Sequence, residues 1–253
     1  MTVAELYTYF DTRFSASLSL PWDHDGLQIC PDPGREVRRV LVSLDVTREA
    51  VARAVREGCD AVLTHHPLLF APLRQICTGV GRGGTALPLI RAGIAQMSFH
   101  TRFDAADGGM NDLLCAAVGV EPAGRVGPSG EEVARLARIE PQTPRAFARK
   151  VKKALGAAFV LLTEAEKDPI ERIAVCGGDA KDFILPAAEA GAQLLLCGRA
   201  GYNADVEAPE YGISVLEAGH YDTEAVCLPY FAEELTRLGI EPILHAERVV
   251  SAL

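Results

Sequence analysis

Short apolar runs alternate along the chain with longer segments in which apolar residues recur at helical spacing. In the first half, runs at 37–46, 60–64 and 93–99 predict strands, and the continuous apolar run at 60–64 is typical of a strand covered on both faces. The segment 47–58 between the first two predicts a helix, with Thr47 as its N-cap. Strands that alternate with helices predict a mostly parallel sheet with helices packed outside it.

The rest of the first half follows the same logic. Apolar residues at helical spacing predict helices at 3–14, 86–92 and 110–118. The stretch 79–84 is glycine-rich and therefore predicts a loop. Its glycines lack the spacing of a phosphate-binding motif.

The second half repeats this order of elements. Strands are predicted at 171–177, 193–197 and 212–216, with a helix at 183–191 between the first two. In both halves the third strand runs on to a histidine, so we interpret the pattern as a weak internal duplication. The proline-containing segment 121–168 is expected to link and decorate the second unit.

The predicted fold class is therefore α/β, with two similar halves of mostly parallel sheet, residues 1–125 and 126–253. The chain has 253 residues, 49% of them apolar, and a formal charge of −9, which disfavours an extended nucleic-acid or anionic-membrane surface. No apolar run approaches the ~20 residues that span a bilayer, and the first residues lack a signal-peptide pattern. Seven scattered cysteines without a C-x-x-C pair predict neither disulfides nor a thiolate zinc site, and favour a reducing cytoplasm.

Two of the six histidines stand side by side in AVLTHHPLLF, at the end of a predicted buried strand. In parallel α/β units functional groups collect at the carboxyl ends of strands. Neighbouring side chains of an extended chain point in opposite directions, so His65 and His66 would hold two neighbouring ions more easily than one. A single histidine here would more simply satisfy backbone groups.

The other strand-end histidines also have carboxylates nearby. His100 precedes Asp104 by four residues and Asp107 by seven, and His220 precedes Glu224 by four. A helix after His220 would place it and Glu224 on one side of the first turn. Either aspartate could instead cap the following helix, and Glu224 could simply complement a helix N-terminus. Together, however, the pattern predicts a histidine–carboxylate metal site.

Five segments carry a family resemblance. In chain order these are WDHDGLQI, LTHHPLLF, HTRFDAADGGMND, AVCGGDAKDFILPAAEAGA and GHYDTE. They resemble, in the same order, motifs of the NIF-three-like family of dinuclear metal-centre hexameric proteins, the GTP cyclohydrolase 1 type 2 homologues. The similarity spans the chain and matches the short form of the family. Three positions depart from the family pattern without touching the expected ligands: His24, Arg199 and Asn203.

The resemblance implies a site in the cleft between two similar α/β halves, and a ring of six chains. It also implies that His100 lies behind the metal ligands or in the substrate pocket, where it could act as a general acid or base, with Glu224 as the other catalytic residue. The metal ligands that it implies are His65, His66, Asp104, His220 and Glu224.

This ligand set suits two divalent ions of Zn, Fe, Mn, Co or Ni. Two such ions can activate a shared water, so the expected reaction is hydrolysis of a C–N or phosphoester bond in a nucleotide-like substrate, as in a GTP cyclohydrolase. The alternative is a non-catalytic, ring-shaped protein that binds or delivers metal or engages another protein.

Overall fold

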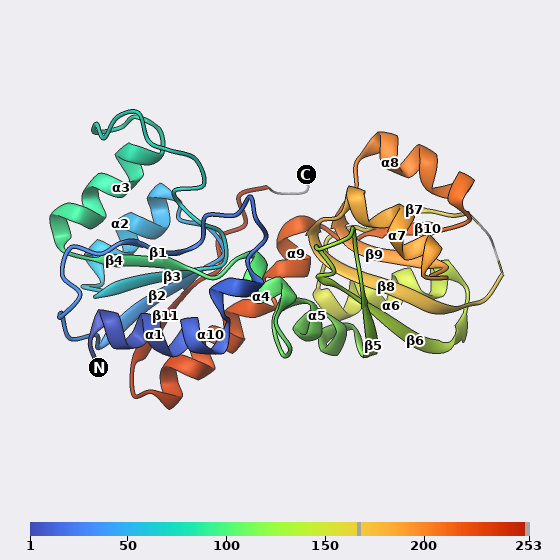
Figure 1. Ribbon diagram of the computed structural model, residues 1–253, viewed down its shortest axis with the longest axis horizontal. Coiled ribbons are helices and arrows are strands. Elements are labelled where there is room, and N and C mark those ends of the chain that lie inside the picture. Colours follow the sequence, from blue (N-terminus) through green and yellow to red (C-terminus); the bar gives the residue numbers. More distant parts are fainter. Residues whose placement is uncertain (166–167, 251–253) are drawn as a thin grey trace. The chain divides into compact units, whose positions relative to one another are not determined.

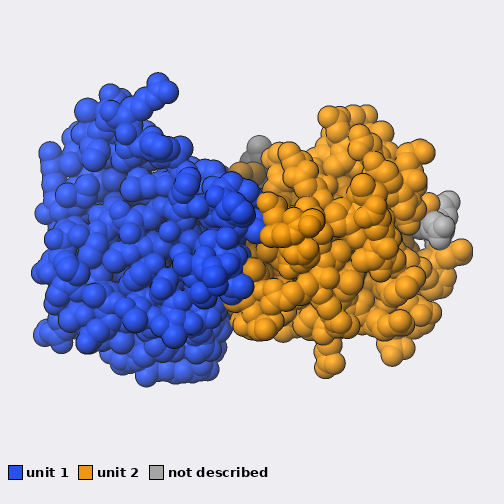
Figure 2. All heavy atoms as spheres, in the orientation of Figure 1, with its two compact units in different colours: residues 1–103, 227–249 blue, residues 104–226, 250–253 orange. Residues whose placement is uncertain are grey.

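The computed structural model describes residues 1–165 and 168–250, which form two compact units (Figure 2). The first unit combines Met1–Phe103 with Cys227–Val249, and the second is built from Asp104–Val226. The boundaries differ from the expected halves because the chain leaves the first unit a few residues after its third parallel strand and returns to it near the end.

The first unit is built around a five-stranded sheet with the order β1-β4-β3-β2-β11. The last four of these strands pair in parallel, and only β1 is antiparallel to its neighbour, so the predicted mostly parallel sheet is confirmed here. The strands are β1 (Gly26–Ile29), β2 (Arg39–Ser43), β3 (Ala61–Thr64), β4 (Ala95–Ser98) and β11 (Glu241–His245).

Helices cover both faces of this sheet, with α2 and α3 on one side and α1 and α10 on the other (Figure 1). The Thr47 hydroxyl accepts a hydrogen bond from the Ala50 N–H, as predicted for an N-cap. Apolar residues of α2 and α3 pack on Leu41 and Val62 of the sheet. The helices are α1 (Val3–Arg13), α2 (Arg48–Arg56), α3 (Gly81–Ala92) and α10 (Cys227–Arg237).

The predicted loop at 79–84 is wrong, because α3 already begins at Gly81. Two glycines in the first turn of α3 allow the preceding segment to pack closely against the helix. A Cβ atom on Gly83 would lie 2.2 Å from the Gln75 carbonyl oxygen, and one on Gly84 would lie 2.9 Å from the Cys77 carbonyl oxygen. The preceding segment therefore crosses the helix at a distance that side chains would forbid.

The second unit contains a six-stranded mixed sheet with the order β5-β6-β8-β9-β10-β7. Only β8, β9 and β10 pair in parallel, and the other three pair antiparallel. The segment expected to link and decorate this unit in fact supplies three strands and a helix within its described residues. The strands are β5 (Glu121–Val126), β6 (Ala134–Gln142), β7 (Leu161–Thr163), β8 (Ile170–Asp179), β9 (Leu194–Arg199) and β10 (Ser214–Glu217).

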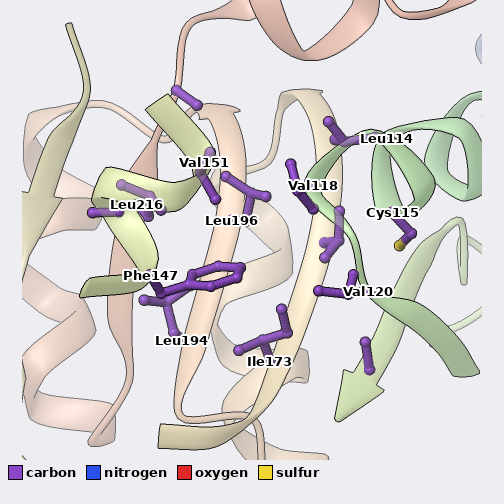
Figure 3. Packing of buried hydrophobic residues seen from close by; sticks show 14 of the residues in the cluster. Leu114, Cys115, Val118, Val120, Phe147, Val151, Ile173, Leu194, Leu196 and Leu216 are labelled. Atoms are coloured by element: carbon purple, nitrogen blue, oxygen red, sulfur yellow. The ribbon is translucent and has the colours of Figure 1, made fainter. Parts of the chain in front are cut away.

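The core of the second unit lies between its sheet and helices α5 and α6. Phe147 and Val151 of α6 lie in one cluster with Leu194, Leu196 and Leu216 of the sheet (Figure 3). All five side chains are fully buried. The helices of this part of the chain are α4 (Thr101–Ala105), α5 (Met110–Val118), α6 (Pro144–Leu155), α7 (Ile184–Glu189), α8 (Tyr202–Glu207) and α9 (His220–Glu224).

The predicted duplication is visible at the start of equivalent strands. The Asp60 carboxylate, just before β3, accepts hydrogen bonds from the backbone N–H groups of residues 38 and 39, at 2.9 and 3.1 Å. The Gln193 side-chain oxygen, just before β9, accepts from residues 171 and 172 at the same two distances. Both units therefore fix the register of two neighbouring parallel strands with one side-chain oxygen.

Two other properties bear on the class of protein. No helix within the described residues is long and apolar enough to cross a bilayer. All seven cysteines lie in the described part of the chain, none is in a disulfide, and five are buried.

Candidate metal centre

Three histidines meet at the carboxyl ends of adjacent parallel strands in the first unit. His65 and His66 directly follow β3, and His100 lies two residues beyond the end of β4. Their ring centroids are 4.9, 5.2 and 5.5 Å apart, and each ring offers a nitrogen within 4.8 Å of the other two. We call these residues the histidine cluster. The structure thus brings His65, His66 and His100 together in one cluster.

The expectation that His65 and His66 point in opposite directions is wrong. It assumed an extended backbone, but β3 ends at Thr64 and both histidines lie in a bend. The bend is fixed by the Thr64 hydroxyl, which donates to the His66 carbonyl at 2.7 Å, and by the His66 N–H, which donates to Leu44 at 2.9 Å. The two rings can therefore converge.

Each histidine of the cluster holds its Nδ1 against an oxygen acceptor. The partner of His65 is the Phe99 carbonyl, at 2.9 Å, and that of His66 is the Asp45 carboxylate, at 2.9 Å. His100 has the Asp23 carboxylate at 3.0 Å. Because a carbonyl oxygen can only accept, Nδ1 of His65 carries the proton and Nε2 carries the lone pair that coordinates a metal. The two carboxylates favour the same tautomer, a frequent arrangement behind metal-binding histidines.

Two buried carboxylates hold the segment that begins the next helix. Burial alone would raise the pKa of Asp23, but hydrogen bonds from His100 and Thr101 outweigh it and hold the pKa well below the usual range. Asp23 therefore stays ionised as the acceptor for His100. Asp25 accepts from the His100 backbone N–H at 2.9 Å and pairs with Arg102 at 2.8 Å.

In the second unit, α9 presents a histidine and a carboxylate on one side, as predicted. Nε2 of His220 lies 3.1 Å from Oε2 of Glu224, which is 5% exposed. Thr223, between them in the helix, is fully buried, and its hydroxyl accepts from the Gly178 N–H at 3.2 Å. The helix is therefore tied to the C-terminal end of β8.

Two glycines make room for α9. A Cβ atom on Gly178 would lie 2.3 Å from Oε1 of Glu224, and its φ of +67° is itself unfavourable for other residues. A Cβ atom on Gly198 would lie 2.8 Å from Cα of His220 and 2.7 Å from the Thr223 hydroxyl. Gly178 and Gly198 together thus let the helix and its carboxylate approach the sheet closely.

Asp104 lies half-buried on α4. The capping alternative for this segment is wrong, because the N-cap of α5 is Gly109, which makes no side-chain cap. Asp107 instead pairs with Arg125 at 2.6 Å, with its own side chain 96% exposed.

Reasoning from the sequence missed the acceptors Asp45 and Asp23. Asp45 follows the end of β2 by two residues, so the rule that pointed to His65 would also have found it. Of the three departures from the family pattern, Arg199 and Asn203 are exposed in the second unit. His24 lies in the first unit, with its ring 6.4 Å from that of Phe70.

Fold and side chains together define a class: a mixed α/β protein with two sheets, histidines clustered at strand ends and a histidine–carboxylate pair on a short helix. A family model described as Duf34/NIF3 (NGG1p interacting factor 3) matches residues 1–248. The chain belongs to this family.

Relatives support this assignment over most of the chain. Proteins named GTP cyclohydrolase 1 type 2 homolog are 29% identical in Streptococcus pneumoniae, over 87% of this chain and 85% of the relative, and 27% in Nostoc, over 95% and 93%. Reduced HcgD from Methanocaldococcus jannaschii has a TM-score of 0.84 at 26% identity, covering 96% of this chain and 97% of that one. A Bacillus cereus protein related to NIF3 shares the fold, with a TM-score of 0.86 at 20% identity over 100% and 99%.

Proposed function

We propose that the protein binds two divalent transition-metal ions per chain and uses them to hydrolyse a nucleotide-like substrate. The observation that carries this proposal is the histidine cluster, in which three imidazoles each hold Nδ1 on an oxygen acceptor. The proposed ligands are His65, His66, Asp104, His220 and Glu224.

The donor chemistry fits such ions. Neutral imidazole nitrogens and carboxylate oxygens without thiolate suit Zn, Fe, Mn, Co or Ni. When bound, two such ions supply Lewis acidity and a water of lowered pKa. Glu224 contributes the negative charge that complements the ions, and the close approach at Gly178 fixes its carboxylate.

His100 is proposed as the acid–base group beside the ligands. Asp23 fixes its ring and keeps one proton at Nδ1, so proton exchange with substrate takes place at Nε2. The ionised Asp23 also stabilises the imidazolium form that His100 adopts after it accepts a proton, which is the role required of the partner of a general base.

The substrate class rests on the names of the curated relatives, which are GTP cyclohydrolase 1 type 2 homologs. For this chain we propose hydrolysis of a C–N or phosphoester bond in a nucleotide. We also propose that six chains form a ring. A ring-shaped metal-binding scaffold without catalysis is the outcome that remains if metal is found and no substrate is turned over.

Elemental analysis of protein purified without chelator tests the metal. We expect close to two ions per chain, and loss of both in the double variant His65→Ala, His66→Ala. The control is His245→Ala, which removes an imidazole from the end of β11 in the same sheet. Protein that carries no metal under these conditions, or a double variant that keeps it, would contradict the proposal.

Glu224→Gln tests catalysis, because it keeps size and one oxygen while removing the charge. Formate release from GTP, together with a screen of nucleotides and phosphoesters, should show a loss of about 10²–10³ in rate, since removal of a single electrostatic contact at a reacting centre costs about that much. Equal trace rates for wild type and variant across the screen would leave the scaffold as the better account.

A further inference from the structure

Two exposed aromatic rings lie beside the histidine cluster. Trp22 is 47% exposed and Phe70 is 39% exposed, and their ring centroids are 6.0 Å apart. The His100 ring lies 6.2 Å from Trp22 and 6.4 Å from Phe70. All three belong to the first unit, so the rings continue the cluster of imidazoles outward. We call Trp22 and Phe70 the aromatic pair.

The three rings meet edge to face, with interplanar angles of 61°, 72° and 80°. Aromatic rings prefer offset or perpendicular neighbours, and either member of the pair has ring surface in solvent for a further ring.

The loop that carries Trp22 is firmly anchored. The next residue is Asp23, whose side chain is fully buried and accepts from both the N–H and the hydroxyl of Thr101, at 3.0 and 2.6 Å. Two residues further on, Asp25 accepts from the His100 N–H and pairs with the almost fully buried Arg102. An exposed indole held on a rigid loop loses little conformational entropy when a ligand covers it.

Gln28 of β1 joins the two members of the pair. Its side-chain nitrogen donates to the carbonyl of Leu69 at 3.2 Å and to the carbonyl of His24, and its side-chain oxygen accepts from the Leu69 N–H at 2.8 Å. One amide therefore fixes both the residue before Phe70 and the loop after Trp22. The backbone on both sides of the aromatic pair is therefore held by the same side chain.

We propose that the aromatic pair is a binding subsite for the planar heteroaromatic ring of the substrate, a nucleobase, with Gln28 as the residue that positions it. This inference rests on the proposed function, because it takes the histidine cluster as the reaction centre. A base stacked on Trp22 or Phe70 would lie next to His100, the proposed acid–base group. Stacking requires only a π-face, so the subsite selects aromatic over aliphatic groups and contributes little choice among bases.

The chain offers a direct readout, since Trp22 is its only tryptophan. Guanosine should quench the tryptophan fluorescence saturably, whereas ribose 5-phosphate, which has no aromatic ring, should not. Phe70→Ala should weaken guanosine binding about tenfold, because stacking on one ring is typically worth about that much. Phe70→Tyr keeps the ring and should restore binding, and Phe159→Ala, which removes an exposed ring of the second unit, should leave it unchanged.

The results separate this inference from the proposed function. Unchanged guanosine affinity in Phe70→Ala, or equal quenching by ribose 5-phosphate, overturns the subsite. A changed assembly mass in Phe70→Ala, with guanosine affinity unaltered, would show that the pair contacts another copy of the chain and also overturns it. A third outcome is wild-type protein that is purified without chelator, carries no metal, and still binds guanosine through Phe70. It would contradict the proposed metal function and support the aromatic pair as a base-binding subsite.

Discussion

At the scale of single residues, the oxygen atoms behind the histidines matter as much as the histidines. Phe99, Asp45 and Asp23 each select one tautomer of an imidazole, and a backbone bend turns His65 and His66 toward each other. These contacts turn three ordinary strand-end histidines into a set of aligned donors.

Removal of Asp45 should therefore weaken metal binding without unfolding the protein. We expect Asp45→Ala to lower affinity about 10- to 100-fold, as is typical when the partner of a metal-binding histidine is lost. Its side chain is 43% exposed, so the stability cost should be small. Metal titration after chelation measures the effect. Asp107→Ala, which removes a 96% exposed carboxylate, is the control, and equal affinities for the two variants would count against the role of Asp45.

Gly178 should tolerate no side chain. In Gly178→Ala the new Cβ atom would press against Glu224, so we expect displacement of that carboxylate, loss of metal or activity, and lower stability. Gly201→Ala is the matched control, because Gly201 also has a positive φ, +89°, but has open space around it. The control bears only backbone strain, of order 1 kcal/mol. Thermal unfolding and metal content of both variants decide; similar behaviour would mean that strain alone explains Gly178.

Much of this level could be predicted from the sequence. Strand-end position and spacing to carboxylates identify His65, His66, His100, His220 and Glu224 as candidates. The acceptor of His65 was not predictable, because it is a backbone carbonyl. Asp45 could have been found from its place after β2, whereas Asp23 comes from a separate loop. Contacts between segments distant in the chain leave no periodic trace in the sequence.

At the scale of elements, apolar periodicity identified the parallel strands other than β11, and the helices α1, α2, α3, α5 and α7. The strands were recognisable because a strand covered on both faces must be apolar throughout. Periodicity missed β1 and the start of α3, and it gave too small a part to the segment that forms β5, β6 and β7. Edge strands have an exposed face, as in the mostly exposed β5, so their pattern resembles that of a loop.

The oxygen at the start of β3 predicts a pH effect on stability. Burial opposes the ionisation of Asp60, but hydrogen bonds from the backbone of Arg38 and Arg39 and from the Arg35 side chain lower its pKa below the ordinary value of 3.8. The folded state thus favours the charged form. Its contribution is complete above the ordinary value and declines as pH falls through the lowered pKa.

Asp60→Asn should remove this dependence, because an amide does not titrate there. Gln193 shows that an amide oxygen can accept from the equivalent pair of N–H groups in the second unit. We expect the difference in unfolding free energy between wild type and variant to shrink as pH falls below about 4. Urea unfolding across this range measures it. A constant difference at all pH values would show that Asp60 does not contribute through its charge.

At the scale of the whole molecule, the two units share an arrangement of three parallel strands and differ in the strands added around them. The ring of six chains proposed above can be tested directly. Light scattering should then give about six times the 27.1 kDa chain mass. A single-chain mass over a broad range of concentration would remove the ring and leave the candidate metal centre as it is.

The return of the chain to its first unit has a consequence for its synthesis. Strand β11 pairs with β2 in the first sheet, and the side chains of Arg39 and Glu241 that join them are 202 positions apart. On the ribosome, residues 104–226 are complete before the first sheet receives its last strand. The part made first must therefore wait for the part made last, with the edge of β2 exposed meanwhile to nonspecific pairing. Chaperones that bind nascent chains should accordingly engage stalled chains ending before residue 241 more than chains that include β11.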